Sequence, residues 1–330
     1  MNPEDLNIYI QGVRSQNRRI LSKTITLIES SRPDHQQLAR EIVDQLLPHS
    51  GKAVRLGITG VPGAGKSTFI ESFGMLLVGS GHRVAVLAVD PSSSRSGGSV
   101  MADKTRMEKL AVEPNAFIRP SPSGGTLGGV ARKTRETMLV CEAAGFDVII
   151  VETVGVGQSE TTVASMVDFF LVLMLAGAGD ELQGIKRGVL ELADAIAINK
   201  ADGDNLEKAR KAARIYASVL HMLQPASPNW EPQVLTCSAL EMTGIAEIWQ
   251  MVLKYHKKLT ASGELEQKRQ KQALDWLWSL VEEGLKARFY TNPEIKKRLN
   301  QIARAVENGD TTPTLAADKL LFFLDNHQPV

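Results

Sequence analysis

The chain has 330 residues, 43% of them hydrophobic, which is enough for a sizeable core and for about two domains. Its 38 basic and 37 acidic side chains give a formal net charge of +1, so no global field would recruit nucleic acid or an anionic membrane. The two cysteines, Cys141 and Cys237, have no further ligand at metal spacing, and we expect them to be buried, reduced thiols.

Residues 1–50 contain no strand-like run and show helical spacing of apolar residues in 21–28 and 38–47, which predicts a helical N-terminal extension. The first residues lack the basic start and apolar core of a signal peptide. The longest apolar run, 169–179, is too short to span a bilayer. We therefore expect a cytoplasmic protein without membrane or nucleic-acid partners.

Residues 51–258 alternate short runs rich in valine and isoleucine with helical stretches, which is typical of a parallel sheet covered on both faces. The sequence predicts an α/β fold of the P-loop NTPase type, with a mainly parallel, doubly wound sheet. The expected strands are 54–59, 83–89, 116–118, 148–151, 169–175, 195–199 and 233–237.

Residues 259–330 return to helical spacing and are predicted to form a helical C-terminal arm. One stripe of this arm is apolar and is equally compatible with ordinary core packing and with a dimer interface. It consists of Leu274, Leu277, Trp278, Val281 and Leu285.

A phosphate-binding loop lies between the first predicted strand and an apolar helix. It matches G-x-x-x-x-G-K-[ST] in full, with Gly60, Val61, Pro62, Gly63, Ala64, Gly65, Lys66, Ser67 and Thr68. Glycines let successive N–H groups and the helix N-terminus point at phosphate. We expect Lys66 to reach the β- and γ-phosphates and Ser67 to offer its hydroxyl to Mg²⁺.

Two acidic residues after predicted strands are candidates for the metal and the switch. Asp90 is expected to hold Mg²⁺ through water, although it could instead cap a turn. Glu152, followed three residues later by Gly155, matches the D-x-x-G pattern of guanine-nucleotide switches, with glutamate in place of aspartate. Glu152 would lie near Mg²⁺ or the attacking water, and the Gly155 amide would contact the γ-phosphate.

Guanine recognition is predicted from the N-K-x-D sequence Asn199, Lys200, Ala201 and Asp202. A carboxylate at Asp202 accepts from both N1–H and the exocyclic amine of guanine, whereas adenine offers neither donor there, so GTP should be preferred over ATP. After the last strand, the amides in Ser238, Ala239 and Leu240 are placed to contact guanine O6, and only their position supports this. Lys186, in a glycine-rich segment, would offer charge to phosphate or is merely solvated.

These motifs together resemble the MeaB/ArgK family of P-loop GTPases, and the resemblance covers nearly the whole chain. The segments that carry it are 60–68, 89–93, 103–107, 152–160, 179–186 and 199–202. The string E-T-V-G-V-G-Q-S-E at 152–160 is the most distinctive.

The resemblance implies a homodimeric GTPase that acts as a chaperone for adenosylcobalamin-dependent methylmalonyl-CoA mutase, in cofactor loading and protection. It implies that Asp90, Asp103 and Glu152 surround Mg²⁺, that Asn199, Lys200 and Asp202 hold guanine, and that 177–188 is a third switch loop. Taken alone, Asp103 is typical of a solvated helix start. The dimer would be built by the C-terminal arm.

The expected reaction is in-line attack of water on the γ-phosphate of GTP, giving GDP and phosphate. The residue after Gly155 is Val156, with no glutamine in the usual water-orienting place, so we expect slow intrinsic turnover that a partner accelerates. Two alternatives stay open. One is a nucleotide-dependent kinase linked to arginine/ornithine transport, and the other is a metallochaperone GTPase, although the six histidines are scattered.

Overall fold

Seven strands form one sheet with the order β3-β2-β4-β1-β5-β6-β7, and every pair of neighbours is parallel. The prediction of a doubly wound α/β fold is confirmed, and the expected strands are all present with ends that differ by at most two residues. The strands are β1 Val54–Gly60, β2 Val84–Val89, β3 Ala116–Arg119, β4 Val148–Thr153, β5 Phe169–Leu175, β6 Ala195–Asn199 and β7 Gln233–Thr236.

The computed structural model describes residues 3–89, 107–120, 127–153, 158–177, 187–223 and 227–325. These residues belong to two compact units, Met1–Arg269 and Gln270–Val330. The first unit contains the whole sheet. The boundaries at 50 and 258 expected from sequence stay predictions.

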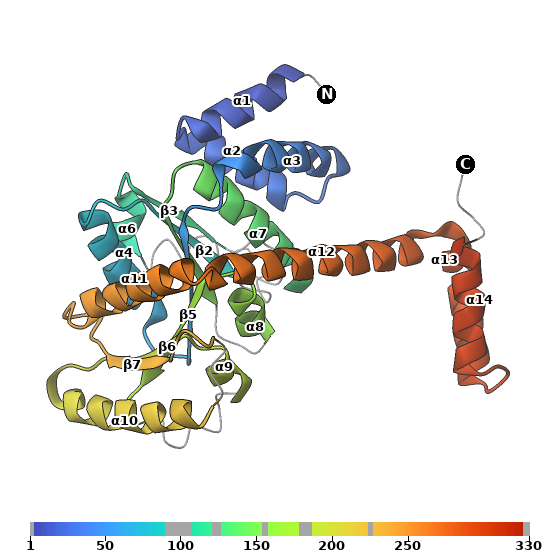
Figure 1. Cartoon of the computed structure of the whole chain (residues 1–330). Coiled ribbons are helices and arrows are strands. Elements are labelled where there is room, and N and C mark those ends of the chain that lie inside the picture. The colour runs from blue at the N-terminus through green and yellow to red at the C-terminus, as the bar shows by residue number, and fades with distance from the viewer. Residues whose placement is uncertain are drawn as a thin grey trace. The chain divides into compact units, whose positions relative to one another are not determined.

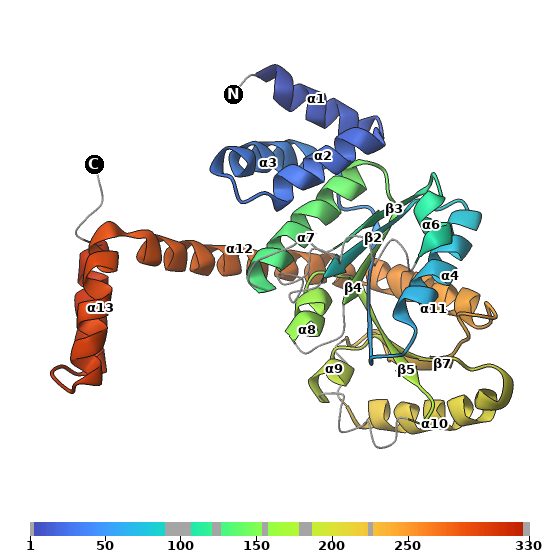
Figure 2. The ribbon, with the colours of Figure 1, turned by 180° about the vertical axis from the view of Figure 1, so that it is seen from behind.

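Helices cover both faces of the sheet because side chains of successive strand residues point to opposite sides. One face packs against α4 (Lys66–Gly79), α6 (Glu108–Val112) and α11 (Ile245–Ala261). The other packs against α7 (Leu127–Ala143), α8 (Gln158–Ala164), α9 (Arg187–Glu191) and α10 (Leu206–Met222). Figures 1 and 2 show α4 and α11 on one side of the strands and α7 and α8 on the other.

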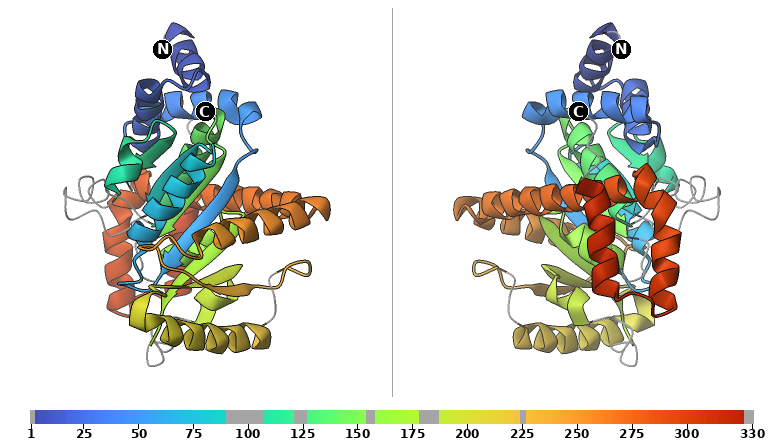
Figure 3. Two further views of the ribbon diagram at one scale, coloured as in Figure 1. Left: turned by 90° about the vertical axis from the view of Figure 1, so that its left-hand side faces the viewer. Right: turned by 90° about the vertical axis from the view of Figure 1, so that its right-hand side faces the viewer.

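Three helices precede the sheet, namely α1 (Pro3–Arg14), α2 (Arg18–Glu29) and α3 (Pro33–Leu46), followed by the 3₁₀ turn η1 (Leu47–His49). Asn17 caps α2, since its side chain accepts from the N–H groups of Arg19 and Ile20 at 3.1 Å. The helices join the same apolar core as α7, and Figure 3 shows them grouped together beside the sheet. The N-terminal extension is thus part of the first unit.

Helix α12 (Glu264–Thr291) begins in the first unit, and its first residues are held where β5 begins. The Arg269 guanidinium donates from Nε and Nη2 to the two carboxylate oxygens of Asp168, at 2.8 and 2.6 Å. Nη2 also donates to the carbonyl of Ala53 at 2.7 Å, just before β1. Because Asp168 is only 1% exposed, this bidentate pair fixes the root of α12 to the amino ends of β1 and β5.

The second unit consists of the rest of α12 with α13 (Pro293–Glu307) and α14 (Pro313–Asp325). Asn292 caps α13 by accepting from the N–H of Glu294 at 2.9 Å. Ile295 on α13 is fully buried, and the guanidinium of Arg298 lies 4.3 Å from the centre of the Phe323 ring on α14. The predicted C-terminal helical extension is therefore present as a helical hairpin that follows α12.

Candidate functional site

The phosphate loop connects β1 to α4 at the carboxyl edge of the sheet, where open α/β sheets place their ligands. Gly60 must be glycine because an added Cβ would lie 2.3 Å from the carbonyl oxygen of Leu173 on the neighbouring strand. Gly65 has φ +80°, a left-handed conformation that residues with a side chain rarely adopt. It immediately precedes the first residue of α4. The predicted sequence of strand, glycine loop and helix is confirmed.

Lys66 begins α4 and folds back over this loop. Its Nζ donates to the carbonyl of Gly60 at 2.9 Å and to that of Val61 at 3.5 Å. Burial lowers the pKa of Lys66, while the negative charges of Glu152 and Glu160 oppose that shift. The lysine therefore sits in a partly desolvated position where two carboxylates favour its charged form.

Glu152 and Glu160 approach Lys66 from two elements. Glu152 is the penultimate residue of β4, and Glu160 lies in the first turn of α8; each is only 7% exposed. The hydroxyls of Thr59 and Thr153 share a hydrogen bond of 2.6 Å and join the ends of β1 and β4. The sequence predicted Glu152, but it gave no role to Glu160, whose only signal was its place at the end of the E-T-V-G-V-G-Q-S-E string.

Asn199, at the end of β6, links the phosphate loop to the segment after β7. Its Nδ2 donates to the carbonyl of Ala64 at 2.8 Å, and its Oδ1 accepts from the N–H of Ala239 at 3.1 Å. The Sγ of Cys237 lies 3.6 Å from the same oxygen. Because Asn199 is 1% exposed, its amide holds two loops together, a role that the sequence did not predict.

Asp202 and Ser238, which lie in the two segments after β6 and β7, contact each other. The Ser238 hydroxyl donates to Oδ2 of Asp202, and the N–H of Ala201 donates to the carbonyl of Cys237 at 2.9 Å. No hydrogen bond within the described part of the chain uses Oδ1 of Asp202. Leu240 follows with 81% exposure. A carboxylate fixed by a neighbouring hydroxyl, with acceptor capacity left over, suits a ligand that presents two adjacent donors.

Lys200 has φ +60°, an uncommon conformation for a residue other than glycine. Its Cε lies 3.8 Å from where a Cβ on Gly65 would stand, so its stem runs beside the phosphate loop. The predicted phosphate and base residues therefore come together at one edge of the sheet. Asp90, Asp103, Gly155 and Lys186 lie outside the described residues.

Both cysteines are free and buried, as predicted. Burial raises the pKa of the Cys237 thiol to about 12 and raises that of Cys141 further. Among the described ranges, no three His, Cys, Asp or Glu side chains cluster as a metal would need. No helix in those ranges is long and apolar enough to cross a membrane.

Comparisons with known proteins find similar chains that match nearly the whole length of this one. The model of the family described as methylmalonyl-CoA mutase-associated GTPase MeaB matches residues 21–294. A probable GTPase of Mycobacterium tuberculosis is 55% identical over 310 residues, which are 94% of this chain and 92% of the relative. The GTPase ArgK of Escherichia coli is 50% identical over 324 residues, 98% of each chain. A crystal structure of an LAO/AO transport system kinase, 44% identical, matches 99% of both chains with a TM-score of 0.79.

Proposed function

The chain belongs to the MeaB family of methylmalonyl-CoA mutase-associated GTPases, and from this premise we propose that it is a Mg²⁺-dependent GTP switch that acts as a chaperone for methylmalonyl-CoA mutase. The mutase would be the adenosylcobalamin-dependent enzyme, with the switch governing cofactor loading and protection. The observation that supports this most is the family match over most of the chain, combined with Lys66 and Asp202 at one edge of the sheet.

The phosphate end of the site would work by position and charge, since phosphoryl transfer to water needs little covalent help from a protein. Gly60 to Thr68 would cradle the phosphates with their N–H groups, and Lys66 would exchange its carbonyl partners for β- and γ-phosphate oxygens. Burial lowers the pKa of Lys66 and the buried carboxylates of Glu152 and Glu160 oppose that shift, which supports a charged lysine in this role. Gly155 and Lys186 are proposed as further phosphate contacts.

Magnesium fits the donors at this end of the site. The Ser67 hydroxyl and the Glu152 carboxylate are oxygen donors, the type that Mg²⁺ selects. Ser67 follows Lys66 in the chain, and the charge of Glu152 acts on Lys66. Asp90 and Asp103 are proposed to complete the set. When bound, the ion would neutralise charge on the β- and γ-phosphates.

Guanine would be read by Asp202, with its Oδ1 and Oδ2 facing N1–H and the exocyclic amine. Support comes from the Ser238 hydroxyl, which holds this carboxylate in place. Asn199 fixes the two flanking loops, and the stem of Lys200 would cover one face of the base. The amides of the Ser238–Leu240 segment would meet O6.

The test is GTP hydrolysis by the purified chain, alone and with increasing active mutase. We expect slow turnover that rises with mutase, abolished by Lys66→Ala and unchanged in the matched surface variant Lys208→Ala. Asp202→Asn should weaken guanine selectivity and admit xanthosine triphosphate, because an amide N–H can donate to the 2-oxo group of xanthine. Turnover that stays constant across the mutase titration would contradict the chaperone function, and equal use of ATP and GTP would contradict the base assignment.

A second candidate function is a kinase, favoured by the LAO/AO transport system kinase that matches 99% of this chain. A kinase would transfer the γ-phosphate to an acceptor hydroxyl or amine instead of water. Incubation with γ-labelled GTP and basic amino acids or their binding proteins separates the two: label in inorganic phosphate alone supports the GTPase, and label in an acceptor supports the kinase.

We further propose a cytoplasmic homodimer assembled through the arm at 259–330. Support comes from the stripe on α12, whose five members are 40–63% exposed within a single chain: Leu274, Leu277, Trp278, Val281 and Leu285. The molar mass measured by light scattering should be twice that of one chain. In the Trp278→Glu variant the measured mass should fall to that of a single chain. The exposed Glu247→Gln variant should remain dimeric.

A further inference from the structure

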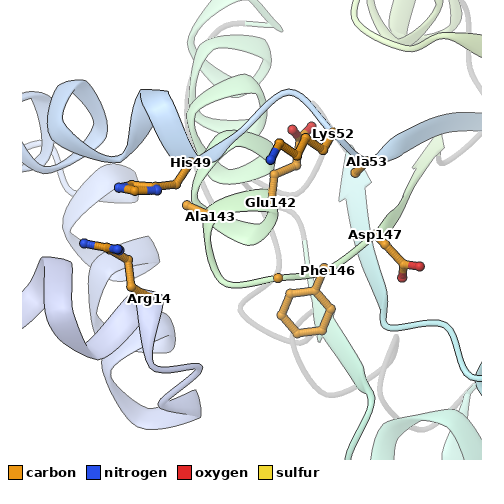
Figure 4. A pocket seen from close by; sticks show the side chains of 9 residues that line it. Arg14, His49, Lys52, Ala53, Glu142, Ala143, Phe146 and Asp147 are labelled. Atoms are coloured by element: carbon orange, nitrogen blue, oxygen red, sulfur yellow. The ribbon is translucent and has the colours of Figure 1, made fainter.

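A cavity of about 360 Å³ lies at the amino ends of β1 and β4, the edge of the sheet opposite the phosphate loop. Its wall combines Arg14 at the end of α1, His49 in η1 and Lys52 before β1 with the end of α7 and the segment between α7 and β4. These last two contribute Glu142 and Ala143, and Gly145, Phe146 and Asp147. Figure 4 shows these side chains arriving from separate elements, with Arg14 and His49 on one side and Asp147 on the other. This volume is in the range of small-molecule sites.

The basic side chains of the cavity are available to a ligand. Arg14, His49 and Lys52 are exposed, and within the described residues none of them takes part in an ion pair or a side-chain hydrogen bond. Arginine offers five N–H donors and lysine three. The wall therefore presents N–H donors without a protein partner on Arg14, His49 and Lys52, and two of these side chains are positively charged.

The acidic side chains of the same wall are already engaged. Glu142 accepts from Nε of Arg55 at 2.6 Å through Oε1, and from the N–H of Gly51 through Oε2. Asp147 accepts from the N–H of Arg83 at 2.7 Å, and its other oxygen lies 2.7 Å from Nδ1 of His82. Each of the four carboxylate oxygens thus has a protein partner, and the guanidinium of Arg55 balances the charge of Glu142. Asp147 keeps its charge, so the two positive charges of Arg14 and Lys52 face one negative charge in the wall.

The floor of the cavity is apolar and held in place. Phe146 is 5% exposed, the guanidinium of Arg83 lies 4.8 Å from its ring centre, and Phe117 lies 6.0 Å from it, centre to centre. Ala53 and Ala143 are buried on either side. A ligand that matches both features has a compact anionic head and a small apolar body.

We propose that this cavity binds a small organic phosphate, with Arg14, His49 and Lys52 around the phosphate head and Phe146, Ala53 and Ala143 against the apolar body. A phosphate dianion has the charge and the acceptor number that these donors can satisfy. The site is separate from the nucleotide site, since the two lie at opposite ends of β1. The proposal does not depend on the mutase function.

The probe is phenyl phosphate, titrated by calorimetry into the full chain saturated with GDP and Mg²⁺, so that the phosphate loop is already filled. We expect one saturable site, weakened by added salt. The double variant Arg14→Gln/Lys52→Gln should bind about 100-fold more weakly, or about tenfold for each charge-assisted contact removed. The matched variant Lys208→Gln/Lys211→Gln, which removes the same charge from the exposed surface of α10, should bind like the unmodified chain.

Other ligands and a conservative variant test which part of phenyl phosphate is recognised. Benzyl alcohol, which has the apolar body without charge, should not bind, and benzoate should bind more weakly than phenyl phosphate. Arg14→Lys, which keeps one charge at that position, should recover most of the affinity lost in Arg14→Gln. Equal affinity in the Arg14→Gln/Lys52→Gln variant would overturn the proposal, as would the absence of saturable binding at millimolar phenyl phosphate in the unmodified chain.

Discussion

Replacing Asn199 by alanine tests whether one buried amide assembles the nucleotide site. The change removes the donor to the carbonyl of Ala64 and the acceptor for the N–H of Ala239. Both groups are in buried residues, since Ala64 is 0% and Ala239 5% exposed. A buried polar group left without a partner costs about 1–3 kcal/mol, so the two together lower the free energy of unfolding by about 2–6 kcal/mol.

Urea unfolding of the nucleotide-free chain, followed by circular dichroism, measures this loss as a lower midpoint at unchanged slope. GDP affinity, measured by calorimetry, should fall more than tenfold, because the loops at 64 and 239 then have to be ordered by the nucleotide. Asn205→Ala is the matched control, since Asn205 donates a single bond, to the carbonyl of Lys200, from the same loop. A midpoint and a GDP affinity equal to those of the control would refute the reasoning.

Three further outcomes are expected. Glu160→Gln removes a negative charge that raises the pKa of Lys66, so single-turnover GTP hydrolysis should slow by about tenfold or more, and GDP affinity should fall as well because Lys66 is assigned to the β-phosphate. Arg269→Leu leaves the buried Asp168 carboxylate unpaired and should lower the free energy of unfolding by about 3–5 kcal/mol, read from the urea midpoint. Burial lowers the pKa of His256 in the folded chain below its ordinary 6.5, so the folded state binds fewer protons than the unfolded chain. The contribution of His256 to the free energy of unfolding is therefore full above pH 6.5 and is lost as the pH falls through the folded pKa. His256→Gln should therefore flatten the thermal-melting profile between pH 7.5 and pH 5.

The controls for these three remove the same chemistry from exposed positions. Glu247→Gln should leave turnover unchanged, and Arg210→Leu, which breaks an exposed pair with Glu207, should cost about 1 kcal/mol or less. His221→Gln should leave the pH profile steep. If a control changes as much as its partner variant, the effect belongs to the loss of any such side chain and not to the burial and contacts described.

The sequence predicted the phosphate loop well because all its determinants are local. Eight consecutive residues, from Gly60 to Ser67, carry the motif, and the strand and helix beside it show their own periodicities. Asn199 was predicted as a residue that holds guanine, whereas its contacts connect loops 135 and 40 residues away. The role of Glu160 had no signal beyond its place in the string at 152–160, because its approach to Lys66 depends on β4 lying beside β1 and on the position of α8. Contacts between distant segments follow from strand order, which a single sequence does not display.

The nucleotide site and the cavity proposed for an organic phosphate lie at opposite ends of the same two strands, β1 and β4. From Val148 to Glu152, β4 covers about 13 Å at its usual rise per residue, and β1 is hydrogen-bonded on both sides over this length. A ligand that displaced the start of β4 would act on Glu152 and Lys66 through this pairing. Any coupling between the two sites would be reciprocal. The ratio of phenyl phosphate affinities in the GDP-bound and GTP-analogue-bound chains must equal the ratio by which phenyl phosphate changes the preference between those nucleotides, and a ratio of one in the first measurement would show that β1 and β4 transmit nothing.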